Sequence, residues 1–267
     1  MFPVYDRQSL PRIESFVALG DSFTEGLDDL DSTGRYRGWA DRFAALLGGH
    51  NPGLRYANLA VRGKRLGQVA AEQVPAAARM GPELVSIAAG GNDILRPGAD
   101  PDVLAGIFDD AVASLQAAGC EVVVFTGFDT AHFPVLRLLR GKIATYNMHL
   151  RAIADQRQCY LVDLWAMPPL RDARAWSSDR LHLSPGGHQR VALRISEVLG
   201  VPVSADWRDP WPPVAASGWL TMRRLDVQWA RRYAAPWVGR RLRGISSGDG
   251  LEPKRPGLLP LQPGNAL

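Results

Sequence analysis

Ser22 and His182 are the two residues of this sequence whose neighbours best suit nucleophilic chemistry. Ser22 follows Gly20 and Asp21 directly after an apolar run, where glycine lets the backbone turn sharply. A serine hydroxyl becomes a useful nucleophile when a base lies beside it. Asp179 stands three residues before His182, so in a tight turn its carboxylate can accept the Nδ1–H of the imidazole. Nε2 would then be free to take a proton from a hydroxyl such as that of Ser22.

The elements that must position these residues alternate along the chain. Short apolar runs predict strands at 15–19, 54–59, 84–88, 121–126 and 160–164. Amphipathic stretches between and after them predict helices near 38–48, 67–79, 102–118, 139–157 and 185–199. Strands that alternate with helices form parallel βαβ units, so we expect a three-layer α/β/α sandwich around a five-stranded parallel sheet.

Polar residues suited to catalysis follow the ends of these predicted strands. Ser22 follows the first strand, Gly63 the second, Asn92 and Asp93 the third, and His182 lies after the last. Ligands bind at the carboxyl ends of strands in open α/β sheets, so these residues should gather at one edge. Each motif alone is weak, but their order and their common position at strand ends make the set specific.

These motifs resemble the SGNH subgroup of the GDSL esterase/lipase family over residues 14–200. The four key residues of the resemblance are Ser22, Gly63, Asn92 and His182, with no departure among them. The resemblance implies a flavodoxin-like catalytic domain and a serine esterase that acts on a small acyl ester or an acylated sugar or lipid. It implies no cofactor.

The same resemblance implies a role for each catalytic side chain. Ser22 would attack an acyl carbonyl, and His182 would accept its proton and later return it to the leaving alcohol. Asp179 would orient the imidazole and stabilise the imidazolium.

An oxyanion hole is also implied by the resemblance. Its donors would be the backbone N–H groups of Ser22 and Gly63 and the side-chain amide of Asn92. Glycine permits a close backbone approach, and the asparagine amide donates without carrying charge. Asp21 and Asp93 are expected to support the turns around the nucleophile and the oxyanion hole.

Plainer interpretations remain open for each of these residues. Ser22 could be a helix N-cap, His182 a surface residue, and Gly63 a turn former. Asn92 could cap the next segment, and Asp179 could serve only the turn, because a backbone carbonyl can also orient the base.

Two other functions also stay open. The chain could be a non-catalytic membrane- or polysaccharide-associated binding protein on the same fold, although a binding module does not require this polar set. It could also be an acyltransferase, if an alcohol acceptor outcompetes water. His132 and Phe133 follow the fourth predicted strand, so they are candidates for lining the substrate pocket.

Several chemistries lack the residues that they need. The sequence has no Gly-x-Ser-x-Gly elbow, no phosphate-binding P-loop, no His-Glu-x-x-His and no Cys-x-x-Cys. Its two cysteines are too few for a disulfide scaffold or a zinc site. We therefore predict no metal, and the partner that we expect is a small-molecule ester. No secretory leader or long apolar run is visible, so the expected location is the cytoplasm.

Residues 205–267 differ in composition from residues 1–204. They carry a formal charge of +5 against −1 for the rest, and five of the eight tryptophans. We therefore place a boundary near residue 205, between a catalytic domain and a basic C-terminal extension. Aromatic residues at helical spacing predict a helix at about 215–243, followed by an irregular tail. This helix should pack on the catalytic domain. Alternatively, it contacts an anionic membrane peripherally or forms a cap over the active site. No nucleic-acid partner is expected, because the slightly acidic body shows no binding module.

Overall fold

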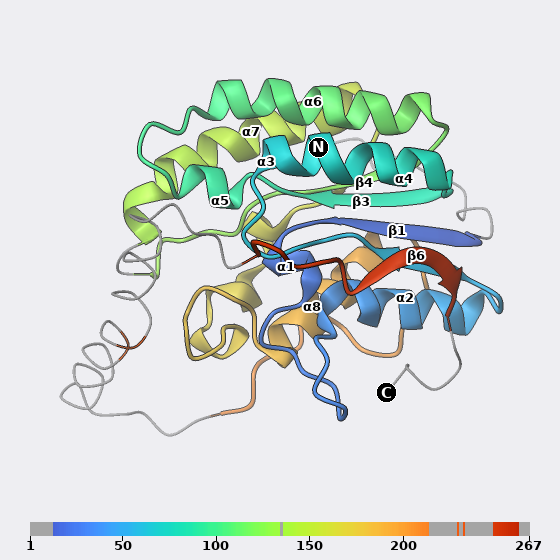
Figure 1. The fold of residues 1–267 in the computed structure, drawn as a ribbon. Coiled ribbons are helices and arrows are strands. Elements are labelled where there is room, and N and C mark those ends of the chain that lie inside the picture. The colour runs from blue at the N-terminus through green and yellow to red at the C-terminus, as the bar shows by residue number, and fades with distance from the viewer. Residues whose placement is uncertain (1–12, 134–135, 214–228, 230–231, 233–247, 262–267) are drawn as a thin grey trace.

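The computed structural model describes residues 13–133, 136–213, 229, 232 and 248–261. The five runs predicted as strands form the parallel part of one sheet (Figure 1). Their bounds are β1 Ser15–Gly20, β2 Arg55–Asn58, β3 Leu84–Ala88, β4 Glu121–Phe125 and β5 Tyr160–Val162. The strand order is β5-β4-β3-β1-β2-β6, which confirms the predicted α/β class.

The sixth strand, β6 (Arg255–Pro260), corrects two predictions: a sheet of five strands and an irregular tail after residue 243. It pairs antiparallel with β2 at the edge of the sheet, with Leu259 opposite Tyr56. The sequence did not predict this strand because proline, here Pro256, argues against a strand. An edge strand tolerates proline, since one side of its backbone needs no hydrogen-bond partner. The end of the predicted C-terminal extension is therefore part of the sheet.

Helices cover both faces of the sheet (Figure 1). One face carries α2 (Gly38–His50) and α8 (Pro185–Val198). The other carries α4 (Val74–Met80), α6 (Pro101–Ala117) and α7 (Arg140–Gln156). The remaining helical segments are short: α1 (Ser22–Glu25), α3 (Leu66–Gln68), α5 (Gly91–Ile94), a π-helical turn at Val69–Gln73, and 3-10 turns at Leu136–Leu139, Leu164–Ala166, Pro168–Arg171 and Ala173–Ala175.

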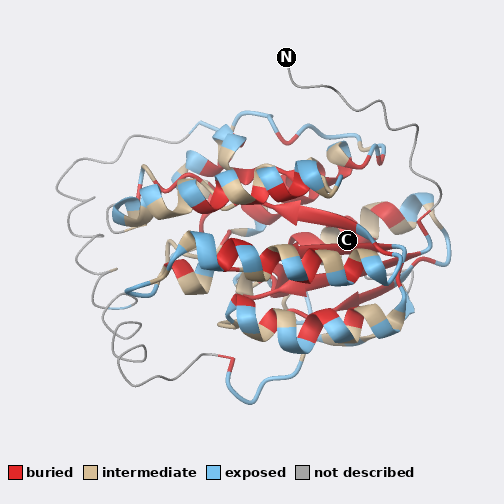
Figure 2. Cartoon of the chain, turned by 90° about the horizontal axis from the view of Figure 1, so that it is seen from above, coloured by how far each residue is buried: buried red, intermediate tan, exposed pale blue. Residues whose placement is uncertain are grey.

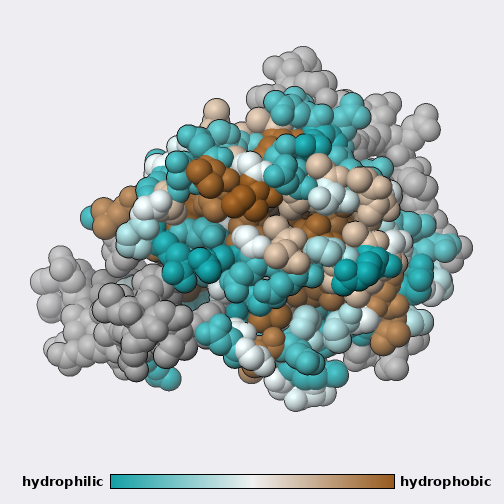
Figure 3. Space-filling view, turned by 45° about the horizontal axis from the view of Figure 1, so that its top comes forward, coloured by the Kyte–Doolittle hydropathy of each residue, from teal (hydrophilic) through white to brown (hydrophobic). Residues whose placement is uncertain are grey.

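The core consists of two apolar layers, one on each face of the sheet (Figure 2). All residues of β1 are buried, and they alternate between the layers, with Phe16 in one and Val17 in the other. The outer surface in the view of Figure 3 mixes polar and apolar residues. The central strands are thus held from both sides, which makes their carboxyl ends a rigid platform.

Residues 201–213 pack against α8, so the expected boundary near residue 205 is not a break in packing. Trp207 is buried, and its Nε1 donates a hydrogen bond to Glu197 at 2.6 Å. The guanidinium of Arg190 lies 4.1 Å from the centre of the Trp211 ring.

The predicted helix at 215–243 lies outside the described residues, apart from Trp229 and Arg232. Its packing and its membrane contact therefore stay predictions. Within the described part of the chain, no helix is long and apolar enough to cross a membrane.

Lys254 fastens the start of β6 to the segments that follow β1. Its ammonium donates hydrogen bonds to the carbonyl oxygens of Glu25 at 2.6 Å, Arg37 at 2.8 Å and Tyr36 at 3.1 Å. It also forms an ion pair with Asp41, whose pKa is raised by burial. One ammonium group thus joins the start of β6 to the end of α1 and to the start of α2.

Replacing Lys254 by methionine should lower the free energy of unfolding by about 2 kcal/mol, because the half-buried Asp41 loses its ion-pair partner and three backbone carbonyl oxygens lose a charged donor. Urea denaturation measures this change. Lys64→Met is the matched control, since Lys64 pairs with the exposed Glu72 and should cost less than about 0.5 kcal/mol. Equal losses in the two variants would contradict the fastening role of Lys254.

Candidate active site

Ser22 lies at the carboxyl end of β1, where three neighbouring residues fix the turn into α1. A Cβ at Gly20 would lie 2.5 Å from a carbonyl oxygen of β3, so only glycine fits there. The side-chain amide of Gln73 accepts the N–H of Gly20 at 2.8 Å and donates to its carbonyl at 2.9 Å. Asp21 caps α1 by accepting the N–H of Phe23 at 3.1 Å. The backbone that carries Ser22 is therefore held by the end of β1, by Gln73 and by the cap of α1.

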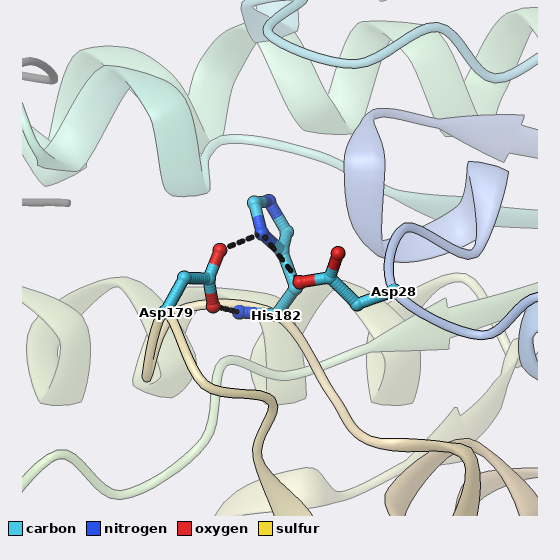
Figure 4. A group of neighbouring side chains, drawn as sticks. All are labelled: Asp28, Asp179 and His182. Atoms are coloured by element: carbon cyan, nitrogen blue, oxygen red, sulfur yellow. Dashed lines mark hydrogen bonds and ion pairs between the residues drawn. The ribbon is translucent and has the colours of Figure 1, made fainter. Parts of the chain in front are cut away.

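The turn before α8 brings His182 and Asp179 to Ser22. Nδ1 of His182 lies 2.6 Å from Oδ2 of Asp179, and Nε2 lies 3.1 Å from Oγ of Ser22 (Figure 4 shows the first contact). Asp179 Oδ1 accepts the backbone N–H groups of Leu181 at 2.9 Å and His182 at 3.0 Å. These bonds hold the Asp179 carboxylate beside the imidazole of His182.

The electrostatics of the site favour an ionised Asp179 and a basic His182. Burial would raise the pKa of Asp179, but its hydrogen bond to His182 and the charge of that residue hold the pKa well below its ordinary value. Burial would lower the pKa of His182, but the Asp179 hydrogen bond and the charges of Asp179, Asp28 and Asp21 raise it. An imidazole of this kind accepts a proton more readily than an ordinary histidine.

Asn92 lies between the loops that carry Ser22 and Gly63. Its Nδ2 donates to Oδ2 of Asp21 at 3.0 Å and to the carbonyl of Lys64 at 3.1 Å. Asp21 is buried, which raises its pKa to about 6. The structure thus brings Asn92 next to the residues that precede Ser22 and follow Gly63.

Gly63 has a φ of +75°, a left-handed conformation that favours glycine. The preceding Arg62 is held by Glu25 of α1, which accepts its backbone N–H at 2.7 Å and its Nε at 3.0 Å. Asp93 accepts the N–H of Leu66 at 2.9 Å, so it supports the segment that follows this loop.

His132 and Phe133 make no hydrogen bond or ring contact with Ser22 or His182. Phe133 is buried, and its ring packs edge-on against Trp176 with centroids 4.9 Å apart. His132 is exposed. Phe133 is thus a core residue, and a pocket role for either side chain stays a prediction.

Gln73, Glu25 and Arg62 are functional neighbours that the sequence analysis missed. Gln73 is 5% exposed, and it lies among apolar residues of a segment predicted as an amphipathic helix. A polar residue on the apolar face was the one signal that could have singled it out. Glu25 and Arg62 lie 37 positions apart and carry no local signal of their pairing.

Trp229, from the C-terminal extension, contacts the turn that carries Asp179. Its Nε1 donates to the Asp179 carbonyl at 2.7 Å, and its ring lies 5.3 Å from the guanidinium of Arg180.

Among the described residues, Asp28, Asp179 and His182 form a group whose ligand-type atoms lie within 4.8 Å of one another (Figure 4). Such spacing can suit a cation, but Nδ1 of His182 is already hydrogen-bonded to Asp179. We therefore interpret the group as the support of the histidine.

A family model described as GDSL-like Lipase/Acylhydrolase family matches residues 18–190. The chain belongs to this family. It is therefore an ester-hydrolysing enzyme, and the matched span contains both Ser22 and His182. No curated protein sequence matches the chain.

Several solved structures share the fold of this GDSL-family enzyme. LAE5, an α/β hydrolase enzyme from the metagenome of Lake Arreo, Spain, is 21% identical, with a TM-score of 0.61 over 72% of this chain and 97% of its own. Axe2, an acetylxylan esterase from Geobacillus stearothermophilus, is 20% identical, with a TM-score of 0.57 over 73% and 95%. TesA is 23% identical, with a TM-score of 0.58 over 69% and 97%. At these identities the likeness concerns the fold.

Proposed function

We propose that this enzyme hydrolyses acyl esters with Ser22 as nucleophile, His182 as general base and Asp179 as the residue that orients the base. The observation that carries the proposal is the hydrogen-bonded series from Ser22 Oγ to His182 Nε2 at 3.1 Å and from Nδ1 to Asp179 at 2.6 Å. This is the geometry in which an imidazole activates a hydroxyl.

The reaction would proceed in two halves. Ser22 Oγ bonds to the acyl carbon while Nε2 of His182 takes the hydroxyl proton, and the imidazolium then gives that proton to the departing alkoxide. Water repeats the sequence on the acyl-serine, which releases the acid and restores the serine. Asp179 stays ionised throughout, because its pKa is held well below its ordinary value by the His182 hydrogen bond and charge despite burial.

The oxyanion of each tetrahedral intermediate would accept the backbone N–H groups of Ser22 and Gly63 and the amide of Asn92. The position of Asn92 between Asp21 and Lys64 supports this role. Both amide protons already have acceptors there, so Asn92 would share one of them with the oxyanion as substrate binds.

Replacing Asn92 by alanine should lower kcat by about 100- to 1000-fold with a smaller change in KM, because an oxyanion donor acts mainly in the transition state. Steady-state kinetics on a nitrophenyl ester checks this. Asn51→Ala is the matched control, since Asn51 caps the end of α2 and donates to the Ile13 carbonyl. A kcat within tenfold of the parent enzyme would exclude Asn92 from the oxyanion hole.

The substrate class that we propose is a small acyl ester or an acylated sugar or lipid. A likeness in fold to Axe2, an acetylxylan esterase, supports including acylated sugars. Assays with nitrophenyl esters from acetyl to palmitoyl and with acetylated xylo-oligosaccharides test this, with Ser22→Ala as control. A preference for acetyl would favour a carbohydrate or small-ester esterase, and a preference for long chains would favour a lipase.

The same assays distinguish the two alternatives. If glycerol is present and more glycerol ester than free acid is formed, the result would favour an acyltransferase. No hydrolysis of any ester, together with binding of a polysaccharide or of vesicles, would favour the binding protein.

A further inference from the structure

Asp28 is a second carboxylate beside the imidazole of His182. It follows α1, and its Oδ2 lies 3.9 Å from Nδ1 of His182 (Figure 4). Figure 4 shows Asp28 and Asp179 approaching the histidine from two different segments of the chain. Asp28 has a φ of +65°, so its backbone adopts a left-handed conformation that few side chains favour.

Ser177 connects the two carboxylates. Its Oγ lies 2.7 Å from Oδ2 of Asp28 and 2.6 Å from Oδ1 of Asp179. The backbone N–H of Ser177 also donates to the carbonyl of His182 at 2.8 Å, which closes the turn. A hydroxyl has one proton and can donate to only one of two carboxylates at a time. Asp28 and Asp179 therefore share one donor while both face the same histidine.

We propose that Asp28 is a positioning residue, a second carboxylate partner of His182 that stabilises the imidazolium formed when Ser22 gives up its proton. The inference rests on the function proposed for Ser22 and His182 and extends it. Asp179 binds Nδ1 directly, whereas Asp28 acts through its charge at 3.9 Å. It thereby makes His182 a stronger base than Asp179 alone would.

The expected contribution of Asp28 to the pKa of His182 depends on the other charged groups nearby and on the exposure of Asp28. Asp179 lies in the same turn, Asp21 precedes α1, and the guanidinium of Arg180 lies over the ring of Trp229. The Asp28 side chain is 40% exposed, so solvent screens its charge. The contribution of Asp28 to the pKa of His182 should therefore be modest, about half a pH unit, which corresponds to about threefold in basicity.

Asp28→Asn is the test variant, because asparagine keeps the shape and tolerates a left-handed backbone. NMR titration of the His182 ring, with its signal assigned by comparison with His182→Gln, measures the pKa without requiring activity. We expect the pKa to fall by about half a pH unit in Asp28→Asn. The acid limb of kcat/KM should move to lower pH by the same amount, because the base is active when neutral. An unchanged His182 pKa in a folded variant would overturn the proposal.

Two controls separate charge from other effects. Asp102→Asn removes a carboxylate on α6 that pairs with His149 rather than with His182, so it should leave the His182 titration unchanged. Ser177→Ala removes the bridging hydroxyl but keeps both carboxylates, so the pKa of His182 should stay near that of the parent enzyme. A fall in this pKa as large as in Asp28→Asn would contradict a direct action of Asp28. If no ester is hydrolysed, the NMR result still decides the role of Asp28, and only the proposed function fails.

Discussion

Alanine in place of Ser22 is expected to lower kcat roughly a million-fold, the loss seen when the nucleophile of a comparable triad is removed. The reason is the absence of the Oγ that lies 3.1 Å from Nε2 of His182 and would form the acyl-enzyme. The fold should be unaffected, since the Ser22 side chain is not needed to cap α1, a role that Asp21 fills. Single-turnover kinetics on the preferred nitrophenyl ester gives the residual rate.

Ser114→Ala is the matched control for this experiment. Ser114 lies on α6, and its hydroxyl donates only to the Asp110 carbonyl one turn before it. Its kinetics should equal those of the parent enzyme. If Ser22→Ala kept more than about one hundredth of the parent rate, the nucleophile would have to be another residue.

The second large effect is expected at Asp179. Asp179→Asn should lower kcat by about four orders of magnitude, because an amide in this place favours the wrong tautomer of the imidazole. The asparagine oxygen can still accept the backbone N–H groups of Leu181 and His182, so the turn should survive. Steady-state kinetics measures the loss, and circular dichroism checks the fold.

A loss of less than tenfold in Asp179→Asn would contradict the role assigned to Asp179. That outcome would direct attention to the other carboxylate near Nδ1, Asp28, at 3.9 Å. The double variant with Asp28→Asn would then show whether Asp28 replaces Asp179 as the partner of His182.

The parallel sheet could be predicted because each of its strands is a short apolar run that is visible in the local sequence. The run from Val122 to Phe125 is continuously apolar, and the structure buries all of it in β4, between β3 and β5. The contact between Asp179 and His182 could also be predicted locally, because residues three positions apart can meet in a tight turn. Family resemblance then paired this turn with Ser22, which lies 160 positions away.

β6 could not be predicted because its stability comes from a partner rather than from its own pattern. Arg255, Pro256 and Gly257 read as loop residues, and the backbone pairing with β2 has no side-chain signature. The contacts of Lys254 could not be predicted for the same reason, since its backbone acceptors lie more than 200 positions away in the sequence.

Supporting residues of the site were missed for a related reason. Gln73 forms two hydrogen bonds with the backbone of Gly20, and Asp28 lies near the imidazole of His182. Neither residue belongs to a motif with fixed spacing. Their importance comes from the way the chain returns to one edge of the sheet. Only a structure brings such pairs together.

Reaction with a fluorophosphonate, followed by intact-protein mass spectrometry and peptide mapping, tests the central claim most directly. A reactive serine attacks the phosphorus and displaces fluoride, which leaves one covalent adduct per enzyme. The account predicts a single adduct on Ser22 that is absent from Ser22→Ala and strongly slowed in His182→Gln. A stoichiometric adduct on any other residue, or ester hydrolysis that survives complete labelling, would contradict it.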